Sequence, residues 1–255
     1  MSKIDVRDLS IHFPVIGADS QSLKRYLKHV AVGGGLAKRN IRSNAPLLVA
    51  LRNVNLSLRP GDRLGLIGSN GSGKTTLLRC LAGAYEPDRG EVEVEGRVAS
   101  LLDLSLGTDP SASGLDNIRL RGLVAGLTRK QIQAKTEEIA EFSGLGPFLA
   151  MPMKTYSSGM QARLAFAVAT SIEAEVLLMD EWIAVGDADF KVKAQERLTS
   201  LVESAHILVI ASHDSSLIKG LCNKIMRLDH GIASDVVPIS DYEELMSRPA
   251  AGSTL

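Results

Sequence analysis

Residues 68–75 have the composition and spacing of a loop that binds phosphate groups. They read GSNGSGKT, which fits GxxxxGK[ST], and they lie between the strand-like RLGLI and the helical TLLRCLAG. Gly68, Gly71 and Gly73 allow such a loop to wrap a phosphate with its amides pointing inward, at a helix end of positive partial charge. Lys74 would reach the β and γ phosphates of a nucleotide, and the Thr75 hydroxyl would bind Mg²⁺. The residues of this segment expected to contact the nucleotide are Gly68, Ser69, Asn70, Gly71, Ser72, Gly73, Lys74, Thr75 and Thr76.

Two acidic residues and a histidine follow apolar strands further along the chain. In VLLMDE a buried strand delivers Asp180 and Glu181 at its C-terminal end, where open α/β sheets bind their ligands. Asp180 is suited to the magnesium shell, and Glu181 is placed to accept a proton from an attacking water. In ASHD, His213 ends another strand and could polarise the γ-phosphate or orient the water. The alternative is that these strands simply end in polar residues as they reach solvent. The catalytic residues expected for hydrolysis of a nucleoside triphosphate are Lys74, Glu181 and His213.

A second segment rich in serine and glycine opens a helix at YSSGMQARLAFAVATSI, residues 156–172. Ser157, Ser158 and Gly159 place free amides and hydroxyls at the positive end of that helix, which suits a phosphate. One chain does not obviously need two phosphate-reading segments. We therefore interpret this tip as a reader of phosphate bound to a second copy of the chain. The alternative is an ordinary serine N-cap on a core helix.

The elements around these motifs indicate an α/β fold. KIDVRDLSIHF and LLVALRNVNLSL read as strands, GEVEVEGRVASLL as a strand or hairpin, and AEVLLMDE and HILVIASHD as buried parallel strands. From 114 to 170 the pattern is helical, and in one helix Thr128 is the candidate N-cap and Ile132, Ile139 and Phe142 are apolar. FKVKAQERLTSLVES is a further helix, and KIMRLDHGIASDVV looks like a closing hairpin. The expected architecture is a nucleotide-binding core with a helical insert.

Composition excludes several classes of protein. The 29 basic side chains are balanced by 29 acidic ones, and aromatic residues make up 4% of the 255 residues, so nucleic acid is not an expected partner. No apolar run approaches the roughly 20 residues that span a bilayer, and the charged start MSKIDVRDLS shows no secretory signal. Any membrane part would have to come from another chain. Cys80 and Cys222 lack metal-type spacing and are expected to be reduced thiols.

A basic insertion at about 16–45 interrupts the strand pattern. A short amphipathic helix is possible at 20–32, ended by the glycines at 33–35. Apart from Asp19, its charged residues are Lys24, Arg25, Lys28, Lys38, Arg39 and Arg42. The insertion is either a solvated surface loop or a contact with anionic lipid headgroups or a membrane subunit.

With these motifs the chain resembles the ATP-binding-cassette (ABC) ATPases from about 49 to 234. In that family a signature motif, LSGGQ, reads the γ-phosphate held by the opposite protomer. Here the segment is YSSGM, in which Ser157 and Gly159 match, Ser158 replaces a glycine and Met160 replaces the glutamine. WIAVGD stands where the family has PTSALD, so Asp187 matches the D-loop aspartate. His213 in ASHD matches the switch histidine.

These differences from LSGGQ and PTSALD are similar to those of the subfamily that exports bacterial surface polysaccharides such as O-antigen, capsule and teichoic acid. The stretches that carry this resemblance are TYSSGMQARLAFAVAT, DEWIAVGDADFKVK and GTDPSASGLDNI. The resemblance implies two copies that close head to tail around two ATP–Mg²⁺. It also implies integral membrane permease subunits. The two copies would drive these subunits to export a lipid-linked polysaccharide. Such a subunit is peripheral, on the cytoplasmic face of the bacterial inner membrane.

The resemblance also implies a domain plan. A single ABC ATPase domain would span 1–250, followed by a tail at 251–255. Its P-loop ATPase core would carry an antiparallel β subdomain and, at about 105–172, the helical subdomain with the signature. Some O-antigen ATPases carry a C-terminal carbohydrate-binding domain. None is expected here, and substrate choice is expected to lie with the permease.

Two family features are not in their usual form. No glutamine occurs between positions 80 and 130, so the place of the Q-loop glutamine is near Asp103 or Ser105. The aromatic residue that stacks on adenine would be Phe13 or, as second candidate, Tyr26.

Two other functions compete with export. One is a soluble ABC ATPase that remodels nucleic acid or ribosomes, although such proteins usually have two cassettes or a long coiled coil. The other is a P-loop kinase for a small molecule, in which YSSGM and VGD would have no role. Hydrolysis of ATP without a phosphoacceptor and co-purification with a membrane subunit would separate these possibilities.

Overall fold

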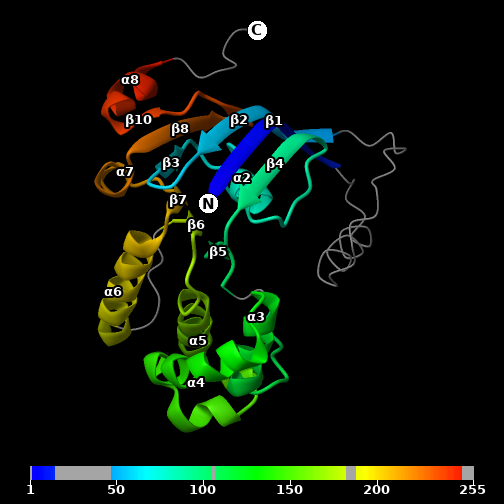
Figure 1. The fold of residues 1–255 in the computed structure, drawn as a ribbon, viewed down its shortest axis with the longest axis vertical. Helices are drawn as coiled ribbons and strands as arrows, with labels where there is room; N and C mark the ends of the chain where they lie inside the picture. Colours follow the sequence, from blue (N-terminus) through cyan, green and yellow to red (C-terminus); the bar gives the residue numbers. More distant parts are fainter. Residues whose placement is uncertain (1, 15–46, 105–106, 182–187, 249–255) are drawn as a thin grey trace.

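The computed structural model describes residues 2–14, 47–104, 107–181 and 188–248 (Figure 1). The predicted helix at 20–32, Tyr26, Ser105 and Asp187 lie outside these ranges. The strands are β1 (Lys3–Pro14), β2 (Leu47–Leu58), β3 (Arg63–Ile67), β4 (Arg89–Glu95), β5 (Val98–Ser100), β6 (Val176–Asp180), β7 (Ile207–Ala211), β8 (Lys224–Asp229), β9 (Ile232–Ala233) and β10 (Val237–Pro238). The α-helices are α2 (Lys74–Leu81), α3 (Gly114–Val124), α4 (Arg129–Ser143), α5 (Ser158–Thr170), α6 (Ala188–Ser204), α7 (Ser215–Leu221) and α8 (Tyr242–Ser247). The 3₁₀ helices are η1 (Gly146–Ala150), η2 (Met153–Thr155) and η3 (Ile239–Asp241).

The strands join in the order β4-β1-β2-β9-β8-β3-β7-β6-β5, with β10 beside β8. The neighbours from β8 through β3, β7 and β6 to β5 are parallel, whereas β1 pairs antiparallel with β2 and β4. Because β3, β6 and β7 are parallel, their C-terminal ends meet at one edge of the sheet. That edge brings the phosphate loop, the two acids and His213 together. β8 and β9 form the expected closing hairpin.

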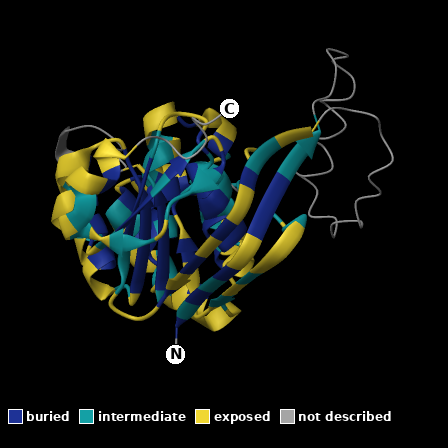
Figure 2. Ribbon diagram, turned by 90° about the horizontal axis from the view of Figure 1, so that it is seen from above, coloured by how far each residue is buried: buried dark blue, intermediate teal, exposed yellow. Residues whose placement is uncertain are grey.

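Alternating side chains of the parallel strands build two apolar layers. Val176 and Leu178 of β6 belong to a cluster shared with α2, β1 and β2, while Leu177 and Met179 belong to one shared with α6 and α7. The helix α2 is therefore enclosed between the parallel strands and the antiparallel ones. Figure 2 shows the central strands in dark blue and the outer faces of the helices in yellow.

The helical insert α3–α5 has an apolar cluster of its own, and Figure 1 shows it at one end of the molecule, away from α8. Thr128 caps α4 as predicted, in a capping box with Gln131, and the C-cap after Ser143 is Gly144 in the left-handed region. Ile132 and Ile139 are buried on its inner face. Across the described ranges, none of the helices is both long enough and apolar enough to cross a membrane.

The hairpin alternative for GEVEVEGRVASLL is wrong. β4 pairs with β1 and β5 pairs with β6, at opposite ends of the strand order. The chain turns between them at Gly96, whose φ of 107° favours glycine. An added Cβ there would lie 2.6 Å from Glu175 Oε2. A local alternating pattern does not reveal which distant strand each half will pair with.

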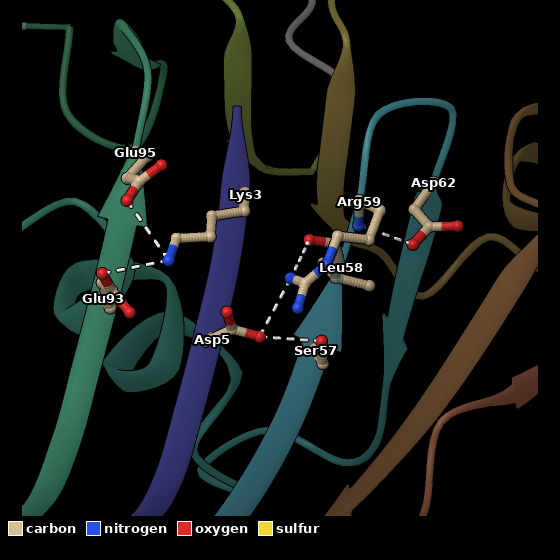
Figure 3. Close-up of polar contacts among 8 residues, drawn as sticks. All are labelled: Lys3, Asp5, Ser57, Leu58, Arg59, Asp62, Glu93 and Glu95. Carbon is tan, nitrogen blue, oxygen red and sulfur yellow. Dashed lines mark hydrogen bonds and ion pairs between the residues drawn. The ribbon is translucent and has the colours of Figure 1, made fainter. Parts of the chain in front are cut away.

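The outer face of β4, β1 and β2 is held by cross-strand polar contacts (Figure 3). Lys3 Nζ lies 3.1 Å from Glu93 Oε1 and 3.2 Å from Glu95 Oε1. Asp5 accepts hydrogen bonds from Arg59 and Ser57, and these lower the pKa of its carboxyl group. Opposite charges on neighbouring strands favour this register over a slipped one.

Candidate active site

The phosphate loop joins the end of β3 to the start of α2. Gly68, Gly71 and Gly73 have φ values of 148°, 78° and 111°, in the region that favours glycine. Ser69 and Asn70 at the crest of the loop are exposed, whereas Ser72 is buried. The three glycines thus adopt conformations that let the loop wrap a phosphate, as the motif predicts, and the crest of the loop is open to a ligand.

Lys74 lies against this loop. Its Nζ donates hydrogen bonds to the carbonyl oxygens of Gly68 at 2.7 Å and Ser69 at 3.0 Å. Burial lowers the pKa of Lys74, and the negative charges of Asp180 and Glu181 act in the opposite direction. The cation is thus held between the loop and the two acids.

The two predicted magnesium ligands are in direct contact. Thr75 Oγ1 donates to Asp180 Oδ2 at 2.5 Å, although the residues are 105 positions apart. A hydroxyl and a carboxylate supply the hard oxygen ligands that Mg²⁺ prefers, with nucleotide phosphates and water completing its shell. Among the described residues no group of three or more His, Cys, Asp or Glu could hold a metal. The Thr75 hydroxyl and the Asp180 carboxylate together fit a Mg²⁺ that also binds phosphate.

Glu181 is held in one position at the same edge of the sheet. Its φ is 68°, unusual for glutamate, and its amide donates to Ala211 O at 2.8 Å. Its carboxylate accepts from Ser212 Oγ at 2.9 Å and from the His213 amide at 3.2 Å. His213 Nε2 lies 3.9 Å from Glu181 Oε1. Half of each side chain is exposed, which leaves room for a water beside the carboxylate.

Sequence reasoning did not single out Ser212, which orients this carboxylate. Its only signal is its place just before His213 at a strand end.

Sequence reasoning also missed Arg121 of α3. It is partly buried, and its Nη1 donates to Ala165 O of α5 at 3.3 Å. Burial lowers the pKa of Arg121, and the charge of Asp103 acts in the opposite direction. Asp103, one of the two Q-loop candidates, thus interacts with the helical insert.

The tip of α5 lies apart from the phosphate loop, with α3 and α4 (Figure 1). Ser157 caps the helix by accepting a hydrogen bond from the Met160 amide at 3.2 Å, as the N-cap alternative predicts. Ser158 and Gly159 are exposed, and an added Cβ on Gly159 would meet only Ser157 Oγ, at 3.9 Å. Nothing described within this chain therefore requires a glycine there. Beside the tip is a groove of about 370 Å³ lined by Gly144, Leu145, Phe148, Ser157, Gly159, Met160 and Arg163.

The aromatic candidate Phe13 is the penultimate residue of β1. Its ring packs edge-on against Tyr85, with centroids 5.5 Å apart, and Arg79 donates to the Tyr85 hydroxyl at 3.1 Å. Stacking of Phe13 on adenine stays a prediction.

Tyr156, at the first position of YSSGM, anchors the tip. Burial raises the pKa of its hydroxyl group, which donates to Phe148 O at 2.6 Å. A Cβ on Gly114 would lie 2.4 Å from that hydroxyl oxygen, so the glycine makes room for it.

Gly114→Ala is expected to lower the free energy of unfolding by about 2 kcal/mol, because the new methyl group overpacks the Tyr156 hydroxyl. In a Tyr156→Phe background the same change should cost at least about 1 kcal/mol less. Urea unfolding of the two single variants and the double variant measures this difference. Strictly additive losses would contradict the contact.

The comparisons with known proteins agree with this geometry. A family model described as ABC transporter matches residues 51–184. The O-antigen export system ATP-binding protein RfbE of Yersinia enterocolitica is 44% identical over 246 residues, which are 96% of this chain and 99% of that protein. RfbB of Myxococcus xanthus, another O-antigen export system ATP-binding protein, is 39% identical over 85% of this chain and 50% of its own length. The teichoic acids export ATP-binding protein TagH of Lactococcus lactis is 40% identical over 71% of this chain and 39% of its own length. These relatives confirm the resemblance to polysaccharide-exporter ATPases.

Solved structures show the same fold at low identity. A structure titled as the ATP binding subunit of an ABC transporter is 19% identical, covers 95% of this chain and 92% of its own, and has a TM-score of 0.66. A dimeric post-hydrolysis state of an ATP-binding cassette bound to ADP and Pi is 17% identical, covers 92% and 98%, and has a TM-score of 0.64. They confirm the predicted α/β fold. Because the family model matches residues 51–184 of 255 and RfbE aligns with 96% of the chain, this protein belongs to the ABC transporter family.

Proposed function

We propose that this chain is the ATP-hydrolysing subunit of a transporter that exports a lipid-linked cell-surface polysaccharide, O-antigen or a related glycan. The observation that carries the proposal is the alignment with an O-antigen export protein over 96% of this chain and 99% of that relative. The partners are a second copy of the chain and integral membrane permease subunits. The chain would be peripheral, on the cytoplasmic face of the inner membrane.

The arrangement of the described residues supports a hydrolysis mechanism. Lys74 binds the β and γ phosphates of ATP and offsets their charge. Thr75 and Asp180 would hold Mg²⁺, which supplies positive charge to the phosphates. Glu181 accepts a proton from the attacking water, because Ser212 and the His213 amide hold its carboxylate in place. The His213 side chain beside it orients that water or polarises the γ-phosphate.

The tip of α5 supports a site shared between two copies. It offers exposed helical amides and a glycine that no described contact of its own chain requires. In a head-to-tail pair, Ser157, Ser158 and Gly159 of one copy would face the γ-phosphate held by the other. Asp187 would lie at the same interface, and Phe13 would stack on adenine.

An apolar patch on α3 supports a permease partner. Leu120, Leu123 and Val124 are 40%, 51% and 71% exposed, at i, i+3 and i+4 on one face of the helix. An apolar cluster rimmed by charged residues such as Arg119 is typical of a contact surface. We propose that this patch receives the cytoplasmic helices of the permease.

Leu123→Asp is expected to reduce co-purification with the permease about tenfold or more, because a charge would be buried at the contact. Its effect on the stability of the free chain should stay within about 0.5 kcal/mol, since the side chain is exposed. Val192→Asp on α6 is the matched control, because Val192 is a similarly exposed (59%) apolar residue of another helix. Equal permease recovery with both variants would contradict the patch assignment.

Deletion of the gene in its own host tests the exporter proposal. A lipid-linked glycan should accumulate inside the cell, and the parent chain, but not a Lys74→Ala chain, should restore export. A normal amount of surface glycan in the deletion strain would contradict the proposal and favour a soluble ABC ATPase.

A further inference from the structure

The turn between β8 and β9 lies directly against the phosphate loop. The Gly231 amide donates to the carbonyl oxygen of Ser72 at 2.9 Å. The Gly231 carbonyl oxygen accepts from the Arg52 amide of β2 at 2.8 Å. One residue of the turn thus links the phosphate loop to a strand of the antiparallel layer through backbone atoms alone.

Glycines on both sides make this close approach possible. A Cβ added to Gly231, whose φ is 81°, would lie 2.8 Å from Ala50 O. A Cβ added to Gly68 would lie 2.1 Å from Leu228 O, and one on Gly73 would lie 2.8 Å from Ala50 O. The opposing atoms are backbone oxygens, so no rotation of a side chain would relieve these contacts. The loop, the turn and β2 are therefore packed backbone against backbone.

The hydrogen bond from Gly231 sets the direction of one peptide group of the loop. A trans peptide is planar, and its C=O and N–H point in opposite directions. Because the Ser72 carbonyl points to the turn, the Gly73 amide points away from the turn. Gly73 is the N-cap of α2, where free amides bind phosphate.

We propose that the β8–β9 turn, through the Gly231 amide, orients the Ser72–Gly73 peptide and so determines the nucleotide affinity of the phosphate loop. This inference rests on the proposed function of that loop as the site of the ATP phosphates. Gly231 is a positioning residue, since it acts through Ser72 and Gly73. Asp180 ends β6 and Glu181 follows it, and β3 and β7 separate β6 from β8, so the turn controls affinity more than the chemical step.

Gly231→Ala is the first test. Its Kd for Mg²⁺–ADP, measured by calorimetry, is expected to rise about tenfold or more, while kcat at saturating ATP stays within about threefold of the parent. Gly61→Ala is the matched control. Gly61 also has a positive φ, of 94°, but an added Cβ there meets nothing within 4 Å. This control carries a similar backbone strain and should leave the Kd unchanged.

Amide hydrogen exchange of the parent protein is the second test, and it needs no variant to fold. If the turn stabilises the binding conformation of the loop, ADP must stabilise the turn by the same coupling energy. Saturating Mg²⁺–ADP is therefore expected to slow exchange of the Gly231 amide about tenfold or more. The Gly61 amide, which donates to His206 O at 2.7 Å in a distant turn, is the internal control and should slow less.

Lys74→Ala separates this inference from the function on which it rests. If Lys74→Ala binds ADP as the parent does, the proposed nucleotide site is wrong. If Lys74→Ala loses binding, two results would overturn only the role of the turn. They are a Gly231→Ala Kd within about twofold of the parent, or equal slowing of exchange at Gly231 and Gly61.

Discussion

Glu181→Gln is expected to lower the rate of ATP hydrolysis about 100-fold or more, with ATP affinity within a few-fold of the parent. The carboxylate accepts from Ser212 Oγ and from the His213 amide. A glutamine of the same shape keeps an oxygen for the His213 amide, and its NH₂ group can donate to Ser212 Oγ. The side chain therefore stays in position but cannot take a proton from water.

Phosphate release and nucleotide binding, measured on the same purified protein, separate chemistry from affinity. In the proposed head-to-tail pair, hydrolysis would reopen the two copies. The variant should therefore accumulate with ATP as a closed dimer, visible by size-exclusion chromatography, because hydrolysis is blocked. Glu173→Gln is the control, since that side chain is 83% exposed and lies away from the site. Hydrolysis within a few-fold of the parent would show that Glu181 is not the proton acceptor.

Much of this site could be predicted from the sequence because its parts follow strand ends. Short apolar runs identify buried parallel strands, and the C-terminal ends of such strands converge in space. That rule, together with the phosphate-loop motif after β3, brings Thr75 near Asp180 across 105 residues, and the structure places them in hydrogen-bond contact. The motif likewise predicts glycines where the loop wraps a phosphate, and the structure gives Gly68, Gly71 and Gly73 positive φ values.

The interactions that hold these parts in place could not be predicted. The Ser212 hydrogen bond to Glu181 and the Gly231 contact with the phosphate loop join segments that pair only after folding. Gly231 reads in the sequence as an ordinary turn glycine, and only its distance from Ala50 reveals a packing role. The separation of β4 from β5 was missed for the same reason, since periodicity is local and strand pairing is not.

Ser157→Arg is expected to abolish ATP hydrolysis, because in the proposed head-to-tail pair its long side chain would lie where the second copy holds its γ-phosphate. The change also removes an N-cap, at a cost of about 1 kcal/mol. Thr128→Ala is the matched control, because Thr128 caps α4 in the same helical insert and its loss should leave activity intact.

Gly159→Ala is a companion variant with no steric conflict inside the chain, and helix propensity should make it up to about 1 kcal/mol more stable. A Gly159→Ala protein that is more stable but less active would show that a contact with another molecule, and not packing within the chain, requires the glycine.

Mixed dimers of Ser157→Arg and Lys74→Ala chains show whether the tip acts on its own chain or on the other. In a head-to-tail pair each site combines the phosphate loop of one copy with the α5 tip of the other. Both lesions then fall on one site of a mixed dimer, and the other site is intact. An equal mixture should recover about a quarter of the parent activity if chains pair at random and sites work independently, since half of the dimers are mixed. If hydrolysis at one site requires both sites to be intact, hydrolysis would not recover, but ATP would still close the intact site, and size-exclusion chromatography would show mixed dimers in the presence of ATP. A mixture with neither hydrolysis nor ATP-dependent dimers beyond those of the two variants alone would show that the tip serves its own chain.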